Sequence, residues 1–310
     1  MTTSDTVKNY NKVEIITLKC YNSYDLLFAF FGGKIMAKHR AAWNCRRYHK
    51  LVNEGRGFGT GSDYKPWITI HDLASKGVVS RVLGRTTGRI HHLLSKNETA
   101  FFYILDASEK AIDIREQFPL LPVTETVEIA ERLGIRHPRD PVSKYPYVMT
   151  TDFVITTPQG NVARSVKLSS ELEKTRVQEK LEIERAYWEK RDIEWRIVTE
   201  KEIDYQKARN LEWVYRSWCY PQMLPDGILA GEVADSFLDL FEKTSLPITE
   251  IARETERTFG LEPGLGLTTF QYLLLQKQIP SVNLSVPLDL VSVRLELGKG
   301  GPVSWIETYV

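Results

Sequence analysis

One stretch limits the fold of this chain more than any other: residues 147–168 have the pattern of two short strands joined by a polar turn. The outer runs are rich in Val, Ile, Thr, Tyr and Phe, and turn-forming residues lie between Pro158 and Asn161. If the strands pair antiparallel across a loop of two or four residues, the residue numbers of opposite residues sum to 319. This register places Asp152 opposite Lys167. Side chains alternate between faces, so Ser165 shares the face of Lys167. The sequence therefore predicts an acid and an amine on one face of a β-hairpin.

This acid–amine pair has two interpretations. It is either a cross-strand salt bridge, worth about 0.2–1 kcal/mol when exposed, or the core of a metal-dependent phosphodiesterase. In the second case the strand carboxylate holds a divalent cation and the lysine orients the attacking water. The choice depends on whether further carboxylates converge on the hairpin.

Glu98 is the first such carboxylate. Together with Ser95 it forms a Ser-x-x-Glu capping box at the start of an apolar helix, which gives it a purely structural interpretation. It also shares a helix face with Phe101 and Leu105. Because a carboxylate in an apolar stripe is costly unless it is paired or bound to metal, Glu98 is a candidate metal ligand.

The order of predicted elements defines the fold class. After the Glu98 helix come a strand ending at Pro119, a short helix at 124–134, the hairpin, a long helix at 169–190 and a strand at 193–199. Glu184 lies on an apolar stripe of the long helix and is a weaker candidate ligand than Glu98. This order predicts an α/β fold with a mixed sheet flanked by helices, as in restriction-endonuclease-like nucleases.

Length and composition suggest two domains of a soluble globular protein. The chain has 310 residues, of which 42% are hydrophobic and 26% charged. Its three cysteines have no CxxC spacing, which favours neither a zinc site nor a disulfide framework and indicates a reducing cytoplasm.

Charge is distributed unevenly along the chain. Residues 34–92 carry a net charge of +9, residues 1–33 are balanced, and residues 93–310 carry −8. This asymmetry indicates either a polyanion-binding face or a solvated basic surface. The candidate DNA-contacting residues are Arg46, Arg47, Lys50, Arg56, Arg81, Arg85 and Arg89.

The basic third contains three local patterns. Residues 40–52 predict a basic amphipathic helix, and a glycine-rich loop at 55–61 follows it, either near a DNA backbone or as an interdomain turn. Residues 78–94 predict a hairpin on which His91 and His92 face opposite ways, so that they cannot ligate one metal together.

The first 35 residues are interpreted as an N-terminal extension of unknown role. Their apolar run at 24–31 is too short to span a bilayer, so we expect no membrane association.

At a finer level, several segments resemble the TnsA endonuclease subunits of heteromeric transposases. These segments are GRGFGTGSDYKPW, TGRIHHLLSKNE, DIREQFPLLP, MTTDF and KLEIERAYW. The resemblance extends from about residue 38 to 213, and more weakly to about 290. It implies a restriction-endonuclease-like catalytic domain at 36–200 and a helical, winged-helix-like domain at 201–310. It also implies Mg²⁺-dependent cutting of the non-transferred strand at the transposon's 5′ ends, with a DDE transposase and an AAA+ ATPase regulator as partners.

The resemblance assigns catalytic roles to Glu98, Asp152 and Lys167. Glu98 and Asp152, with the Val166 carbonyl, would hold one or two Mg²⁺, for which Mn²⁺ could substitute. Further candidate ligands are Ser165 and Glu184. Ser165 stands where related nucleases carry Glu and this family Gln, which weakens one metal contact or transfers it to water and the Val166 carbonyl.

The C-terminal part predicts three helices, at 226–243, 248–258 and 268–277, before a strand-like segment at 281–286. Because this region is not basic, we expect it to contact protein partners rather than DNA. Two alternatives stay open: a standalone restriction or repair nuclease, and a non-catalytic subunit that bridges transposase and ATPase. In each case the expected location is on DNA in the cytoplasm.

Overall fold

The computed structural model describes residues 43–72, 78–279 and 282–291. The predicted N-terminal extension lies outside these residues. Among the helices that they form, none is long and apolar enough to cross a membrane.

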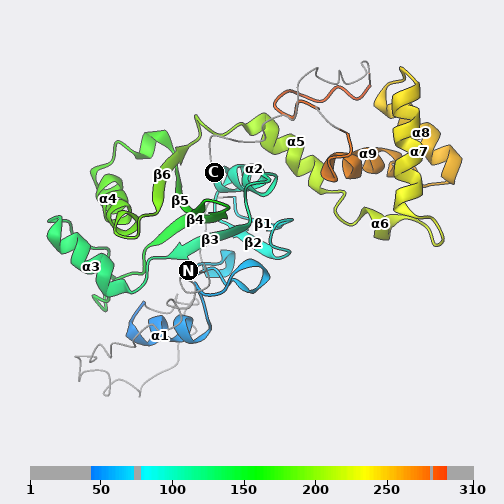
Figure 1. The fold of residues 1–310 in the computed structure, drawn as a ribbon. Coiled ribbons are helices and arrows are strands. Elements are labelled where there is room, and N and C mark those ends of the chain that lie inside the picture. Colours follow the sequence, from blue (N-terminus) through cyan, green and yellow to red (C-terminus); the bar gives the residue numbers. More distant parts are fainter. Residues whose placement is uncertain (1–42, 73–77, 280–281, 292–310) are drawn as a thin grey trace, which may run out of the picture.

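A four-stranded sheet forms the centre of the N-terminal part (Figure 1). Its strands, in spatial order, are β3 (Asp113–Pro119), β4 (Thr150–Thr157), β5 (Gly160–Lys167) and β6 (Glu194–Thr199). The first three are antiparallel, whereas β6 runs parallel to β5. The predicted mixed sheet is therefore confirmed.

The register of the β4–β5 hairpin differs from the prediction by two residues. Thr157 pairs with Gly160 across a loop of Pro158 and Gln159. Paired residue numbers therefore sum to 317 instead of 319, and the β4–β5 ladder ends at the pair Phe153–Arg164, one residue short of Asp152. Asp152 and Lys167 still lie side by side, because the Asp152 carboxylate accepts from the Val166 amide and from the Lys167 ammonium.

Helices cover both faces of the sheet. On one face, α2 (Lys96–Asp106) packs against the β4 side chains Phe153 and Ile155. On the other, α3 (Val123–Arg132) and α4 (Thr175–Glu189) pack against Val154 and Ala163. The long helix begins later than predicted. Glu200 binds the Ser169 amide and hydroxyl, and residues 169–171 form a separate 3-10 turn, η4 (Ser169–Glu171).

The basic third forms smaller elements beside the sheet. Helix α1 (Cys45–Asn53) is capped by the side chain of Asn44, and two 3-10 turns follow, η2 (Gly61–Asp63) and η3 (Ile70–Asp72). The predicted hairpin is confirmed as β1 (Ser80–Leu83) and β2 (Ile90–Leu93).

The glycine-rich loop packs closely against the edge of the sheet. Gly57 has φ +81°, and a Cβ added there would lie 2.2 Å from Cγ of Pro119 in β3. The Gly57 amide donates to the Lys65 carbonyl at 2.6 Å, and the Lys65 amide donates to the Phe58 carbonyl at 3.2 Å. The loop is thus a fixed support for β3.

Gly57→Ala should therefore lower the free energy of unfolding by about 2–3 kcal/mol, because it combines left-handed backbone strain with overpacking against Pro119. Urea unfolding would measure the loss. Gly134→Ala is the matched control, since Gly134 has φ +66° but nothing within 4 Å of an added Cβ. A loss no greater than that of the control would contradict close packing at Gly57.

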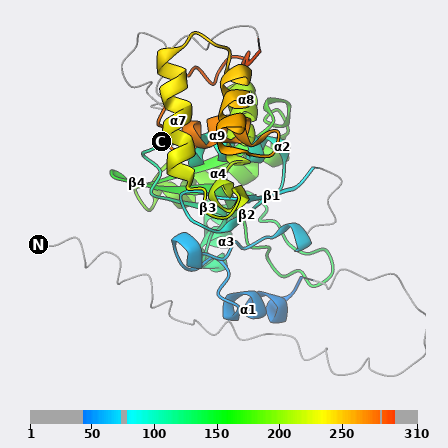
Figure 2. The same ribbon diagram turned by 90° about the vertical axis from the view of Figure 1, so that its right-hand side faces the viewer.

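The C-terminal region is helical. It contains α5 (Tyr205–Tyr215), α6 (Tyr220–Met223), α7 (Ala230–Lys243), α8 (Ile248–Phe259) and α9 (Leu265–Leu275), and α7 to α9 gather at one end of the molecule (Figure 2). The strand predicted at 281–286 is wrong for its described part, because residues 282–286 form turns and coil. Asn210 of α5 donates to the carbonyls of Leu284 and Val286, which replaces a strand partner.

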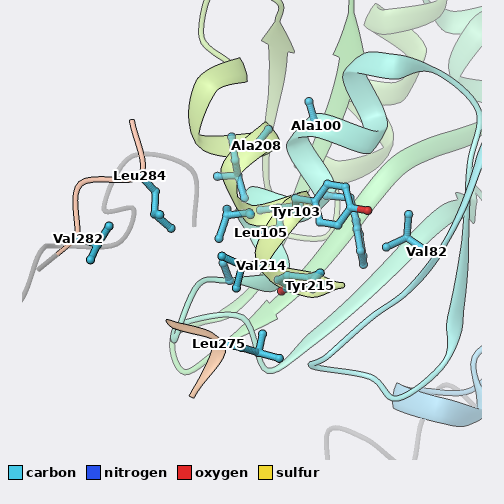
Figure 3. Close-up of a cluster of buried hydrophobic side chains, with 14 of the residues drawn as sticks. Val82, Ala100, Tyr103, Leu105, Ala208, Val214, Tyr215, Leu275, Val282 and Leu284 are labelled. Atoms are coloured by element: carbon cyan, nitrogen blue, oxygen red, sulfur yellow. The ribbon is translucent and has the colours of Figure 1, made fainter. Parts of the chain in front are cut away.

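Helix α5 joins the two parts by packing on α2. The Tyr215 hydroxyl donates to Asp106 at 2.8 Å, and the Tyr103 and Tyr215 rings meet edge to face. Buried side chains from Val82 to Leu284 form one hydrophobic cluster there (Figure 3).

Candidate active site

Four side chains from four different elements meet where α2 begins. They are Glu98 of α2, Gln117 of β3, Asp152 of β4 and Lys167 of β5. The Gln117 amide nitrogen lies 3.3 Å from Glu98 Oε2 and 3.5 Å from Asp152 Oδ1. Lys167 Nζ lies 2.6 Å from Asp152 Oδ2. The structure thus brings together the three side chains for which a catalytic role was predicted.

Asp152 is held by the strand beside it. Its Oδ2 accepts the backbone N–H of Val166 at 2.7 Å as well as the Lys167 ammonium. Lys167 also donates to the Val166 carbonyl at 3.0 Å. A carbonyl oxygen has two lone pairs, so the Val166 carbonyl keeps one for another partner, as its predicted role as a ligand requires.

Glu98 combines its two predicted environments. Its backbone N–H donates to the Ser95 hydroxyl at 3.1 Å, and the carboxylate accepts from the Ser95 hydroxyl at 2.9 Å and from the Leu94 amide at 3.0 Å. In a capping box the Glu98 carboxylate would accept from the Ser95 amide, whereas here it accepts from the Leu94 amide. Burial, followed by the negative charge of Asp152, raises the pKa of Glu98 to about 7. A cap residue therefore also faces a second carboxylate.

Ser165 and Glu184 form a separate buried layer beneath the hairpin. The Ser165 hydroxyl donates to Glu184 and accepts from the Trp195 indole at 3.1 Å, while the Thr151 hydroxyl donates to Glu184 at 2.6 Å. Burial raises the pKa of Glu184, although Lys167 opposes the shift.

Within the described ranges, no group of three or more His, Cys, Asp or Glu is arranged to hold a metal ion. The acidic ligands brought together are therefore Glu98 and Asp152.

The donor set still fits Mg²⁺. The ion commonly binds through one or two carboxylates and completes its octahedron with water and substrate phosphate oxygens. Burial is the main cause of the raised pKa of Glu98, and the neighbouring negative charge of Asp152 adds to it; a cation between the two carboxylates would offset that repulsion.

The predicted DNA-contacting cations fall into two groups. Arg46, Lys50, Arg81 and Arg85 are exposed, whereas Arg47 and Arg56 are half-buried and face Asp72 at 3.8 and 2.5 Å. Arg89 points inward. It is buried, donates twice to Glu116 and also donates to the Ile114 carbonyl, so the structure does not place it on a DNA-facing surface.

The two histidines of β2 lie on opposite faces, as predicted. His91 is fully buried between the Thr87 hydroxyl and the Glu116 carboxylate, at 2.7 and 2.8 Å. His92 is half-buried and, with Arg56 and Lys65, lines an open polar depression of about 710 Å³ beside α1.

Sequence reasoning overlooked Gln117 and Glu116. Both are buried polar residues in the middle of β3. The available signal was their adjacency, because two consecutive polar residues in a short strand place one polar group on each face.

Comparison with known proteins gives two family matches. Residues 108–200 match the model described as TnsA-like endonuclease N terminal, and residues 202–283 match TnsA endonuclease C terminal. The chain is 42% identical over 249 residues to "Transposon Tn7 transposition protein TnsA" of Escherichia coli, covering 77% of this chain and 86% of that protein. The predicted resemblance is confirmed. Asp152 and Lys167 lie inside the first match, and Glu98 lies ten residues before it begins.

Proposed function

This chain belongs to the TnsA endonuclease family and is a transposition endonuclease, and from that premise we propose that it hydrolyses DNA phosphodiester bonds with Glu98, Asp152 and Lys167 in the presence of Mg²⁺. The observation that carries this proposal is the contact between Lys167 and Asp152 at 2.6 Å, beside a second buried carboxylate.

Each residue has a distinct role. Glu98, Asp152 and the Val166 carbonyl would hold one or two Mg²⁺, and the metal would stabilise negative charge that develops on the phosphate. Burial lowers the pKa of Lys167, but the charges of Asp152 and Glu184 outweigh it and raise the pKa above its ordinary value. Lys167 would orient or deprotonate the attacking water.

The proposed reaction cuts the non-transferred strand at the 5′ ends of the transposon and leaves a 5′-phosphate and a 3′-hydroxyl. A DDE transposase would join the 3′ ends, and an AAA+ ATPase would regulate both the transposase and this chain. The reaction would take place on DNA in the cytoplasm. These assignments are supported by the family resemblance of the sequence.

The test is a cleavage assay on DNA that carries a transposon end, labelled separately on each strand, with the partner proteins present. We expect cuts in the non-transferred strand with Mg²⁺ and none with EDTA. Equal cutting in EDTA would refute the metal requirement. Normal transposition by Lys167→Ala would instead favour a non-catalytic assembly role.

A further inference from the structure

Gln117 is the neutral residue of the candidate active site, and none of the roles above uses it. It is 3% exposed and lies between two acids from different elements. Contacts of 3.3 and 3.5 Å are longer than the usual 2.9–3.0 Å, so the amide spans the gap between the carboxylates without pulling them together.

The backbone of Gln117 adopts an unusual conformation for a strand. Its φ is +48°, in the left-handed region that residues other than glycine seldom enter. Neighbouring segments hold this conformation: the Trp67 amide donates to the Gln117 carbonyl at 3.2 Å, and the Tyr64 hydroxyl donates to the Glu116 carbonyl at 3.1 Å. Strained backbone of this kind persists where the surroundings fix it, which is common at functional sites.

The orientation of the Gln117 amide is also fixed. The Thr150 hydroxyl donates to Gln117 Oε1 at 3.2 Å, so the amide nitrogen must face Glu98 and Asp152. Two donor hydrogens on one nitrogen suit two acceptor carboxylates. The Gln117 amide can therefore donate one hydrogen bond to Glu98 and one to Asp152 while the two carboxylates face each other.

We propose that Gln117 is a positioning residue that sets the spacing of Glu98 and Asp152 for a divalent cation. The inference rests on the proposed function, because it takes these two carboxylates as the ligands. Holding ligands apart before the ion arrives reduces the ordering that binding requires, which increases affinity.

The test measures Mn²⁺ binding by calorimetry on the full chain without DNA. Two variants fit the left-handed backbone: Gln117→Gly removes the side chain, and Gln117→Asn shortens it so that one amide cannot reach both acids. For both we expect Mn²⁺ affinity to fall about tenfold, the loss expected for one hydrogen bond to charged groups. Thermal unfolding checks that each variant is folded, and Gln117→Asn serves as the test if the glycine variant is not.

Thr150 supplies a conservative pair of variants. Thr150→Val removes the donor that orients the amide and should weaken Mn²⁺ binding about threefold, whereas Thr150→Ser keeps the hydroxyl and should bind as the wild type does. The matched control is Gln271→Ala, which removes a buried glutamine that donates to the Trp213 carbonyl in the helical region. It should leave Mn²⁺ affinity unchanged.

Asp152→Ala separates the two possible failures. If it loses Mn²⁺ binding while both Gln117 variants bind as the wild type does, the positioning role is refuted and the proposed metal site stands. If Asp152→Ala itself binds Mn²⁺ normally, the metal site and the positioning role are both refuted.

Discussion

Asp152→Ala should reduce DNA cutting by at least about a thousandfold while the chain stays folded. The substitution removes one of the two converging carboxylates and leaves Lys167 without its partner at 2.6 Å. The Val166 amide also loses its acceptor, so the strand that carries Lys167 is less well fixed. Metal binding and placement of the lysine should thus fail together, which is why we expect a larger effect than the loss of either alone.

Single-turnover cleavage of end-labelled DNA would measure this effect, with circular dichroism as a check of folding. The matched control is Asp113→Asn at the other end of β3. Asp113 is also a buried acid, and it accepts from the Gly61 amide at 3.1 Å and lies 3.4 Å from Arg115, away from the site. Its loss should cost stability but leave the cutting rate within about threefold of the wild type. A folded Asp152→Ala protein that cuts normally would refute the assignment.

Glu116→Gln should lower the free energy of unfolding by about 3–5 kcal/mol, because it leaves buried Arg89 without a counter-charge. Glu116 is fully buried and accepts two hydrogen bonds from the Arg89 guanidinium, one from the His91 ring and one from the His92 amide. These contacts join the β1–β2 hairpin to β3. In the Glu116→Gln variant we therefore expect the β1–β2 hairpin to detach from β3 before the rest of the chain unfolds.

The same carboxyl should make stability depend on pH. Burial alone would raise the pKa of Glu116, but Arg89 and His91 lower it from 4.5 to about 2. A lowered folded-state pKa means that the stabilisation is complete above pH 4.5 and is lost as the pH falls towards 2. Urea unfolding between pH 3 and 7 should show a shallower acid limb for Glu116→Gln than for the wild type.

Glu182→Gln serves as the control for this variant, since Glu182 pairs with Arg185 on the exposed side of α4. Its loss should cost less than about 1 kcal/mol. If Glu116→Gln cost no more than this, the buried network would not be a source of stability.

The parts of the site that follow local rules could be predicted from the sequence. Strand alternation predicted that Asp152 and Lys167 meet on the hairpin, and the two side chains are in contact at 2.6 Å despite the register error of two residues. The error arose because residues 158–161 all have turn chemistry, so the loop was predicted as Gln159-Gly160 or as all four residues, whereas it consists of Pro158 and Gln159. The Ser95–Glu98 capping box fixed the helix start in the same local way.

Features that depend on distant partners could not be predicted. Arg89 belongs to a basic run and was expected on the surface, but its partner Glu116 lies 27 residues away on another strand. The left-handed backbone of Gln117 likewise has no marker in the local sequence, and its carbonyl accepts from the amide of Trp67, which lies in a distant segment of the chain. The turns at 282–286 depend on Asn210, 74 residues from Leu284.

Helix α2 has a consequence for how the molecule unfolds. Its first turn carries Glu98, and its last residue, Asp106, accepts from the Arg85 and Thr86 amides and from Tyr215 of α5. The nuclease fold and the helical region therefore share one apolar interior instead of meeting at a wetted interface. Ending the chain after Thr199 would remove α5 and expose the side of α2 that packs against it, and α2 carries the proposed metal ligand Glu98. We therefore expect the sheet and the C-terminal helices to unfold together as one cooperative unit.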